Sequence, residues 1–215
     1  MEAQAVIFDL DGVLVDSNAL AEEHWKTWAA KHDVSLEHIL AVHHGRPTVQ
    51  TMREVAPHLD VEKEARLKED AEADDTEGLQ AIPGAGRLLK GLPEHRRAIV
   101  TSGTRRTATI RLNHCEFPHP RVFITSNDIQ NGKPDPEPYQ RAIELLGYSP
   151  ADCVVIEDAP AGIASAKAAG ARVIAVRTTN GPEALAKADV IVENPEAIEI
   201  EVTENGLAIT ANATA

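Results

Sequence analysis

Residues 5–17 read AVIFDLDGVLVDS, in which a short apolar run is followed by Asp9, Asp11 and Gly12. A continuous apolar run of this kind is typical of a strand that is buried on both faces of a parallel sheet. Similar runs recur at 98–100, 122–124, 153–156, 173–176 and 190–192. We therefore predict that 5–8 is one strand of a parallel sheet and that the two aspartates stand at its carboxyl end.

Helical patterns lie between several of these runs, at 105–112, 139–146 and 162–169. The last two patterns are followed directly by Gly147 and Gly170, and a glycine in that position is a helix stop signal. Strands that alternate with helices indicate a mostly parallel sheet with helices on both faces. The predicted fold class is therefore α/β, a doubly wound parallel sheet with a Rossmann-like core.

The stretch 17–80 interrupts the alternation. It contains helical patterns and no strand-like run, and the patterns fall at 19–32, 36–43, 48–56 and 61–73. We expect Trp25 and Trp28, in the first of them, to lie in the core of this bundle. The predicted organisation is an α-helical domain over 17–80, inserted into an α/β core made of 1–16 and 81–215.

The C-terminal region predicts a β-hairpin. Apolar residues alternate over 198–202 and again over 207–210, and Asn205-Gly206 lies between them. Asn-Gly between alternating apolar residues is a strong hairpin signal and predicts a type I′ turn.

Composition excludes several classes of protein. The 21 Lys and Arg residues against 34 Asp and Glu give a net charge of −13, which argues against binding to nucleic acid or an anionic membrane. Cys115 and Cys153 match no metal-binding spacing, and we expect both to be reduced. The sequence has no apolar run near the roughly 18 residues of a membrane span, and residues 1–4 lack the basic start of a signal peptide. We therefore expect a cytoplasmic protein.

Polar residues follow four of the predicted strands or lie in the loop after them: Asp9, Asp11, Ser102, Gly103, Lys133, Glu157 and Asp158. Each could be only a helix cap, a turn residue or a solvated charge. However, sites in open parallel sheets form at the carboxyl ends of the strands, where these residues would converge. Four carboxylates at one edge would repel each other unless a cation lay among them, and carboxylate oxygens suit Mg²⁺. A lysine and a hydroxyl beside that ion would hold a phosphate.

Taken in order, the segment 8–17, Ser102, Lys133 and the pair Glu157-Asp158 resemble the four motifs of the haloacid dehalogenase-like superfamily. Val13 stands where threonine is common and Ala159 where serine or threonine is frequent, but neither position contributes a metal ligand. The helical insert resembles the small α-helical cap of this superfamily. The resemblance covers essentially the whole chain, and it implies a catalytic α/β core with a cap domain over 17–80.

The resemblance also implies an aspartyl-phosphate mechanism. Asp9 would be the nucleophile, and Asp11 would protonate the departing alkoxide and then deprotonate the hydrolytic water. The cofactor Mg²⁺ would be held by Asp9, the backbone carbonyl of Asp11 and Asp158, with Glu157 binding directly or through water. Because the dehalogenases that name the superfamily generally lack the second acid, Asp11 points to phosphoryl chemistry.

The phosphoryl group would be bound by three further residues. Ser102 and the backbone N–H of Gly103 would hold its oxygens, and Lys133 would bridge nucleophile and phosphate and neutralise developing charge. These roles, too, are implied by the resemblance.

Substrate choice is expected to come from the cap. The segment 43–48, HHGRPT, resembles the cap motif of sugar- and polyol-phosphate phosphatases, which include 2-deoxyglucose-6-phosphate, hexitol and glycerol-phosphate phosphatases. Segments 73–78, 82–84 and 155–162 resemble the same group. The candidate residues for contacts with hydroxyls and phosphate are His24, Arg46 and His44, although solvated side chains are the ordinary alternative.

The leading interpretation is therefore a Mg²⁺-dependent phosphatase of small sugar or polyol phosphate monoesters, acting as a monomer or weak dimer. A β-phosphoglucomutase shares the core motifs and a similar cap, and only the cap resemblance favours hydrolysis. A non-catalytic binding module with the same fold is the second alternative, and the presence of both Asp9 and Asp11 argues against it.

Overall fold

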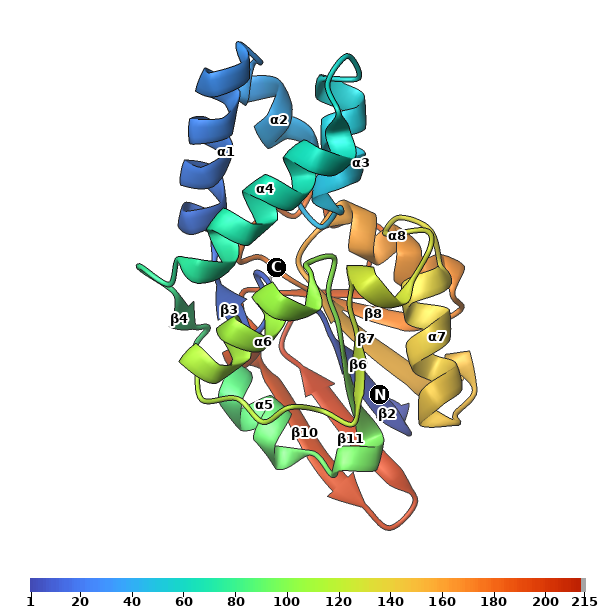
Figure 1. Cartoon of the computed structure of the whole chain (residues 1–215). Coiled ribbons are helices and arrows are strands. Elements are labelled where there is room, and N and C mark those ends of the chain that lie inside the picture. The colour runs from blue at the N-terminus through green and yellow to red at the C-terminus, as the bar shows by residue number, and fades with distance from the viewer. Residues whose placement is uncertain (214–215) are drawn as a thin grey trace.

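The computed structural model describes residues 1–213 (Figure 1). Its centre is a six-stranded sheet with the order β6-β5-β2-β7-β8-β9, in which every neighbouring pair is parallel. The strands are β2 (Ala5–Phe8), β5 (Arg97–Val100), β6 (Val122–Ile124), β7 (Cys153–Glu157), β8 (Arg172–Val176) and β9 (Val190–Val192). The predicted parallel sheet is confirmed, and β2 occupies an interior position between β5 and β7.

Helices cover both faces of the sheet. They are α5 (Ala85–Gly91), α6 (Arg105–His114), α7 (Glu137–Leu146) and α8 (Pro160–Ala168). Side chains alternate across a strand, so Phe8 packs in one hydrophobic cluster with residues of α5 and α6, and Ile7 packs in another with residues of α7 and α8. The doubly wound α/β class is thus confirmed, whereas the short helix α5 was not predicted.

The helical insert contains α1 (Asn18–His32), α2 (Leu36–Val42), α3 (Thr48–Val55) and α4 (Val61–Asp74). Figure 1 shows these helices gathered above one edge of the sheet. The insert has its own hydrophobic cluster, which includes Trp25 and Trp28 as expected, with ring centroids 5.7 Å apart. A short antiparallel pair, β3 (Val15–Asp16) with β4 (Gln80–Ala81), joins the insert to the rest of the chain, and the sequence did not predict it.

The C-terminal hairpin is confirmed, but the predicted turn is wrong. Strands β10 (Ile198–Thr203) and β11 (Gly206–Ala211) are antiparallel, and β1 (Glu2–Ala3) pairs with β11. Thr203 pairs with Gly206, so the loop residues are Glu204 and Asn205, and neither has the positive φ that a type I′ turn requires. A Cβ at Gly206 would lie 2.5 Å from the carbonyl oxygen of Ala3, so this glycine permits the close approach of β1.

Across residues 1–213, the structure contains no helix with the length and apolar character needed to cross a lipid bilayer.

Candidate active site

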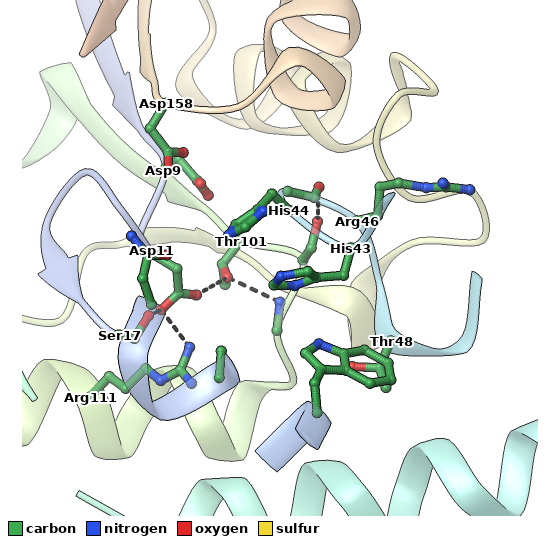
Figure 2. A pocket seen from close by; sticks show the side chains of 16 residues that line it. Asp9, Asp11, Ser17, His43, His44, Arg46, Thr48, Thr101, Arg111 and Asp158 are labelled. Atoms are coloured by element: carbon green, nitrogen blue, oxygen red, sulfur yellow. Dashed lines mark hydrogen bonds and ion pairs between the residues drawn. The ribbon is translucent and has the colours of Figure 1, made fainter. Parts of the chain in front are cut away.

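A cavity lies between the carboxyl edge of the sheet and the helical insert (Figure 2). On the sheet side it is lined by residues that follow β2, β5 and β7: Asp9, Asp11, Thr101, Ser102, Gly103 and Asp158. The strand order explains this convergence, because β5, β2 and β7 are adjacent and parallel, so their ends meet at one edge.

A buried cluster of acids stands at the base of this cavity. One carboxylate oxygen from each of Asp9, Glu157 and Asp158 lies within 4.8 Å of the others. The Nζ of Lys133 is 2.8 Å from Asp9 Oδ1 and 2.7 Å from Glu157 Oε1. Burial alone would lower the pKa of Lys133, but contact with Asp9 and Glu157 holds this pKa above its ordinary value. A single ammonium therefore stands among three buried carboxylates.

The charge on this cluster is not balanced by protein groups alone. Burial raises the pKa of Asp9 to about 7, and Glu157 and Asp11 add to the rise while Lys133 opposes it. Burial, Glu157 and Asp9 likewise raise the pKa of Asp158 well above its ordinary value. Such shifts indicate that a second positive charge at this point would stabilise the ionised carboxylates.

The carboxylate oxygens of the three acids differ in how many hydrogen bonds they accept. Glu157 Oε1 accepts hydrogen bonds from Lys133 and, at 2.8 Å, from the hydroxyl of Tyr139, and Oε2 accepts from the backbone N–H groups of Asp158 and Ala159. In contrast, no donor within residues 1–213 bonds to Asp9 Oδ2. Asp9 and Asp158 lie together in Figure 2, with their carboxylates beside one another. Asp158 accepts a side-chain hydrogen bond from Thr179, whereas Glu157 accepts four hydrogen bonds. The donor set therefore fits a hard divalent cation, with Asp9 and Asp158 better able than Glu157 to bind it directly.

Gly12 makes room for this arrangement. Its φ is +78°, and a Cβ at this position would lie 2.0 Å from Asp158 Oδ2. Only glycine accepts both that conformation and that approach without displacing the carboxylate.

Asp11 points away from the acid cluster, toward α6 (Figure 2). Its Oδ1 accepts hydrogen bonds from Ser17 Oγ at 2.8 Å and from Arg111 Nη1, and its Oδ2 accepts one from Thr101 Oγ1 at 3.3 Å. The sequence reasoning missed Arg111. A signal existed, because Arg111 is spaced with Thr107, Ala108 and Leu112 on the buried face of α6, and a charge on a buried face needs a partner.

Ser102 and Gly103 line the cavity, but both are engaged by protein groups. Ser102 Oγ donates to the carbonyl of Gly45, at 2.9 Å, and so joins the sheet edge to the insert. The N–H of Gly103 donates to Thr101 Oγ1 at 3.0 Å. A phosphoryl group that bound to these donors would replace both contacts.

The insert contributes two histidines, His43 and His44, to the cavity wall. His43 is buried, its Nε2 has no hydrogen-bond partner among residues 1–213, and its ring lies 5.9 Å from that of Trp25. Burial and the neighbouring His44 lower the pKa of His43 to about 3, and burial also lowers that of His44. Both imidazoles are therefore uncharged at neutral pH. His43 was not among the predicted site residues, although it opens the HHGRPT segment that suggested them.

The other predicted cap residues are placed differently. His44 and Arg46 line the cavity, but Arg46 Nη1 is 2.9 Å from Glu54 Oε2 and is thus already paired. His24 is not among the lining residues, and its Nε2 lies 3.1 Å from Asp75 Oδ2. Of the three candidates, the structure therefore brings His44 and Arg46 to the cavity and leaves His24 outside it.

Comparisons with known proteins agree with this architecture. The profile of the haloacid dehalogenase-like hydrolase family matches residues 6–176. Hexitol phosphatase A of Escherichia coli (strain K12) is 38% identical over 96% of this chain and 98% of its own length. Glycerol-1-phosphate phosphohydrolase 2 of Saccharomyces cerevisiae is 36% identical over 93% of this chain and 86% of its own length. The crystal structure of a hydrolase from Pseudomonas syringae superposes with a TM-score of 0.80 at 25% identity, covering 89% of this chain and 94% of that one.

Proposed function

Because the chain belongs to the haloacid dehalogenase-like hydrolase family, we propose that it is a magnesium-dependent phosphatase that hydrolyses small sugar or polyol phosphate monoesters. The observation that carries this proposal is the buried cluster of Asp9, Glu157 and Asp158 around Lys133, at the base of a cavity shared with the insert. We assign catalysis to a core of residues 1–16 and 81–215 and substrate selection to a cap of residues 17–80.

Two aspartates would perform the chemistry. Asp9 attacks phosphorus through a carboxylate oxygen, so that the bond to the leaving oxygen breaks and an aspartyl-phosphate forms. Asp11 gives its proton to the leaving alkoxide, then takes a proton from the water that attacks the aspartyl-phosphate. The products are an alcohol and inorganic phosphate, and both aspartates return to their starting state.

The remaining residues would bind charge. Lys133 holds Asp9 in place and faces the phosphoryl oxygens, while Ser102 and the N–H of Gly103 exchange their present partners for the phosphate. Asp9, Asp158 and the backbone carbonyl of Asp11 would hold Mg²⁺, whose charge reduces repulsion between the carboxylates and a phosphate dianion. Because both oxygens of Glu157 are occupied, its contact with the ion would run through water.

The cationic side chains of the cavity wall are already paired with carboxylates, and this supports hydrolysis of monophosphates over the mutase alternative. A phosphosugar mutase has to bind an intermediate that carries two phosphates. Within the described part of the cavity wall, Arg46 is paired with Glu54 and Arg111 with Asp11, and the two histidines beside them are neutral. A second phosphate would thus find no unpaired cation, whereas an uncharged polyol chain needs none.

A phosphate-release screen with Mg²⁺ tests the proposal. We expect hexitol, glycerol and hexose monophosphates to be hydrolysed faster than nucleotides or bisphosphates. Incubation with glucose 1-phosphate and catalytic glucose 1,6-bisphosphate separates the alternatives, because a mutase would yield glucose 6-phosphate without releasing phosphate. Absence of phosphate release from all these esters would favour the non-catalytic binding module.

A further inference from the structure

Arg111 lies between two carboxylates that come from different parts of the fold. Its Nη1 donates to Oδ1 of Asp11, which lies in the loop after β2. Its Nη2 donates to Glu72 Oε1, in α4 of the insert, at 2.5 Å. The Arg111 side chain is only 6% exposed. A guanidinium with so little hydration depends on its protein partners for compensation. Arg111 is therefore tied to both Asp11 and the insert.

Glu72 is fixed in turn by a second cation. Its Oε2 accepts a hydrogen bond from Lys68, whose Nζ lies 4.3 Å from the centre of the Trp25 ring. Burial alone would raise the pKa of Glu72, but Lys68 and Arg111 lower it to about 2. Glu72 is thus ionised at neutral pH and holds Arg111 through a charged hydrogen bond.

These contacts constrain one oxygen of Asp11 more than the other. Arg111 and Ser17 both donate to Oδ1, whereas within residues 1–213 Oδ2 has only the longer bond from Thr101. Oδ2 is therefore the oxygen left for exchanging a proton with a ligand in the cavity. Since both Nη groups of Arg111 are bound to carboxylates, its role is to orient Asp11 and not to bind phosphate.

We propose that Arg111 is the positioning residue of Asp11 and that Glu72, by fixing Arg111, makes the orientation of this acid depend on helix α4 of the insert. The inference rests on the proposed function, in which Asp11 protonates the leaving alkoxide. It assigns the insert a part in proton transfer, in addition to contact with the substrate.

The chain provides a matched control. Arg106 also joins α6 to α4, through an ion pair with Asp74, but both side chains are exposed, by 47% and 70%, and neither lines the active-site cavity. Variants Arg106→Lys and Asp74→Asn disturb the contact between the same two helices without touching Asp11. Variants Arg111→Lys and Glu72→Gln disturb the buried bridge.

The first test is the leaving-group dependence of phosphoenzyme formation, measured in single turnovers with a series of aryl phosphates in the presence of Mg²⁺. A misplaced catalytic group costs about 100-fold, and proton donation matters most for basic leaving groups. We expect Arg111→Lys to lose about 10- to 100-fold on phenyl phosphate but less than about threefold on 4-nitrophenyl phosphate. Glu72→Gln should change the dependence in the same direction, and the two control variants should keep the wild-type dependence.

The second test is a crystal structure of Glu72→Gln, and of Arg111→Lys where that variant folds. We expect the Asp11 carboxylate to turn away from its present contacts with Ser17 and Thr101. An unchanged Asp11 in Glu72→Gln, or an equal loss on all aryl phosphates, would overturn the inference. If the wild-type chain releases no phosphate from any ester, the proposed function fails, and the orientation of Asp11 in the crystals still decides whether Arg111 and Glu72 position it.

Discussion

The buried imidazole of His43 should cost the protein stability at acid pH. Burial and His44 lower the pKa of His43 from 6.5 to about 3 in the folded state. In the unfolded chain the same imidazole has its ordinary pKa, so between these two values the unfolded state binds a proton that the folded state excludes. The free energy of unfolding therefore falls as the pH drops below about 6.5, and the loss continues to about pH 3.

The size of the effect follows from the shift. One pH unit in this interval corresponds to about 1.36 kcal/mol, so at about pH 5 the His43 contribution is a loss of about 2 kcal/mol. This is a substantial part of the roughly 5–15 kcal/mol that stabilises a typical domain. It is measurable by urea unfolding at about pH 7.5 and about pH 5, with the urea transition recorded by circular dichroism.

Two variants make the measurement specific. His43→Gln keeps a polar side chain that does not titrate, and His38→Gln removes a histidine whose side chain is 53% exposed. We expect the wild type and His38→Gln to lose about 2 kcal/mol more than His43→Gln on acidification. Equal losses for wild type and His43→Gln would refute the reasoning, because His43 would then be protonated in the folded state as readily as in the unfolded one.

Four other predictions concern the site. EDTA should abolish phosphate release and added Mg²⁺ should restore it, so full activity after exhaustive chelation would contradict a metal at the acid cluster. Asp9→Asn should remove turnover and leave the circular dichroism spectrum unchanged, because an amide is not a nucleophile here. Tyr139→Phe removes the hydroxyl bonded to Glu157 and should lower the free energy of unfolding by about 1.5–3 kcal/mol, the usual value for a hydrogen bond to a charged group; a loss well below this range in urea titrations would mean that water replaces the hydroxyl. His24→Ala should keep the wild-type ratio of kcat/KM for a polyol phosphate to that for 4-nitrophenyl phosphate, since His24 bonds Asp75 outside the cavity, and an altered ratio would return His24 to the list of substrate contacts.

The parts of the fold that were predictable are those whose physical cause is local. The buried strands of the sheet have continuous apolar sequences, such as 5–8 and 153–156, because both faces of each strand are covered. The short strands β1, β3 and β4 have two residues each, too few to form a pattern, and they exist because a distant partner lies alongside. The hairpin turn was mispredicted for the same reason, because the conformation at Gly206 depends on its close contact with the backbone of Ala3, which is distant in sequence.

The candidate site also has a part that the sequence predicts and a part that it does not. Asp9, Ser102 and Asp158 come together because the carboxyl ends of adjacent parallel strands must meet, so strand order alone places them. No comparable rule fixes the direction of a side chain in the helical insert. Arg46 turns to Glu54 and His43 turns inward because of how α2 and α3 pack, and spacing along the sequence does not encode that choice.

The interior place of β2 in the sheet also bears on how the chain folds. The strand before Asp9 pairs through Val6 with Arg97 and through Ala5 with Cys153, and β1 pairs through Glu2 with Ala208. Contacts so distant in sequence form slowly and only after the later segments exist. Asp9 can therefore reach its place beside Asp158 only after β5 and β7 have joined β2.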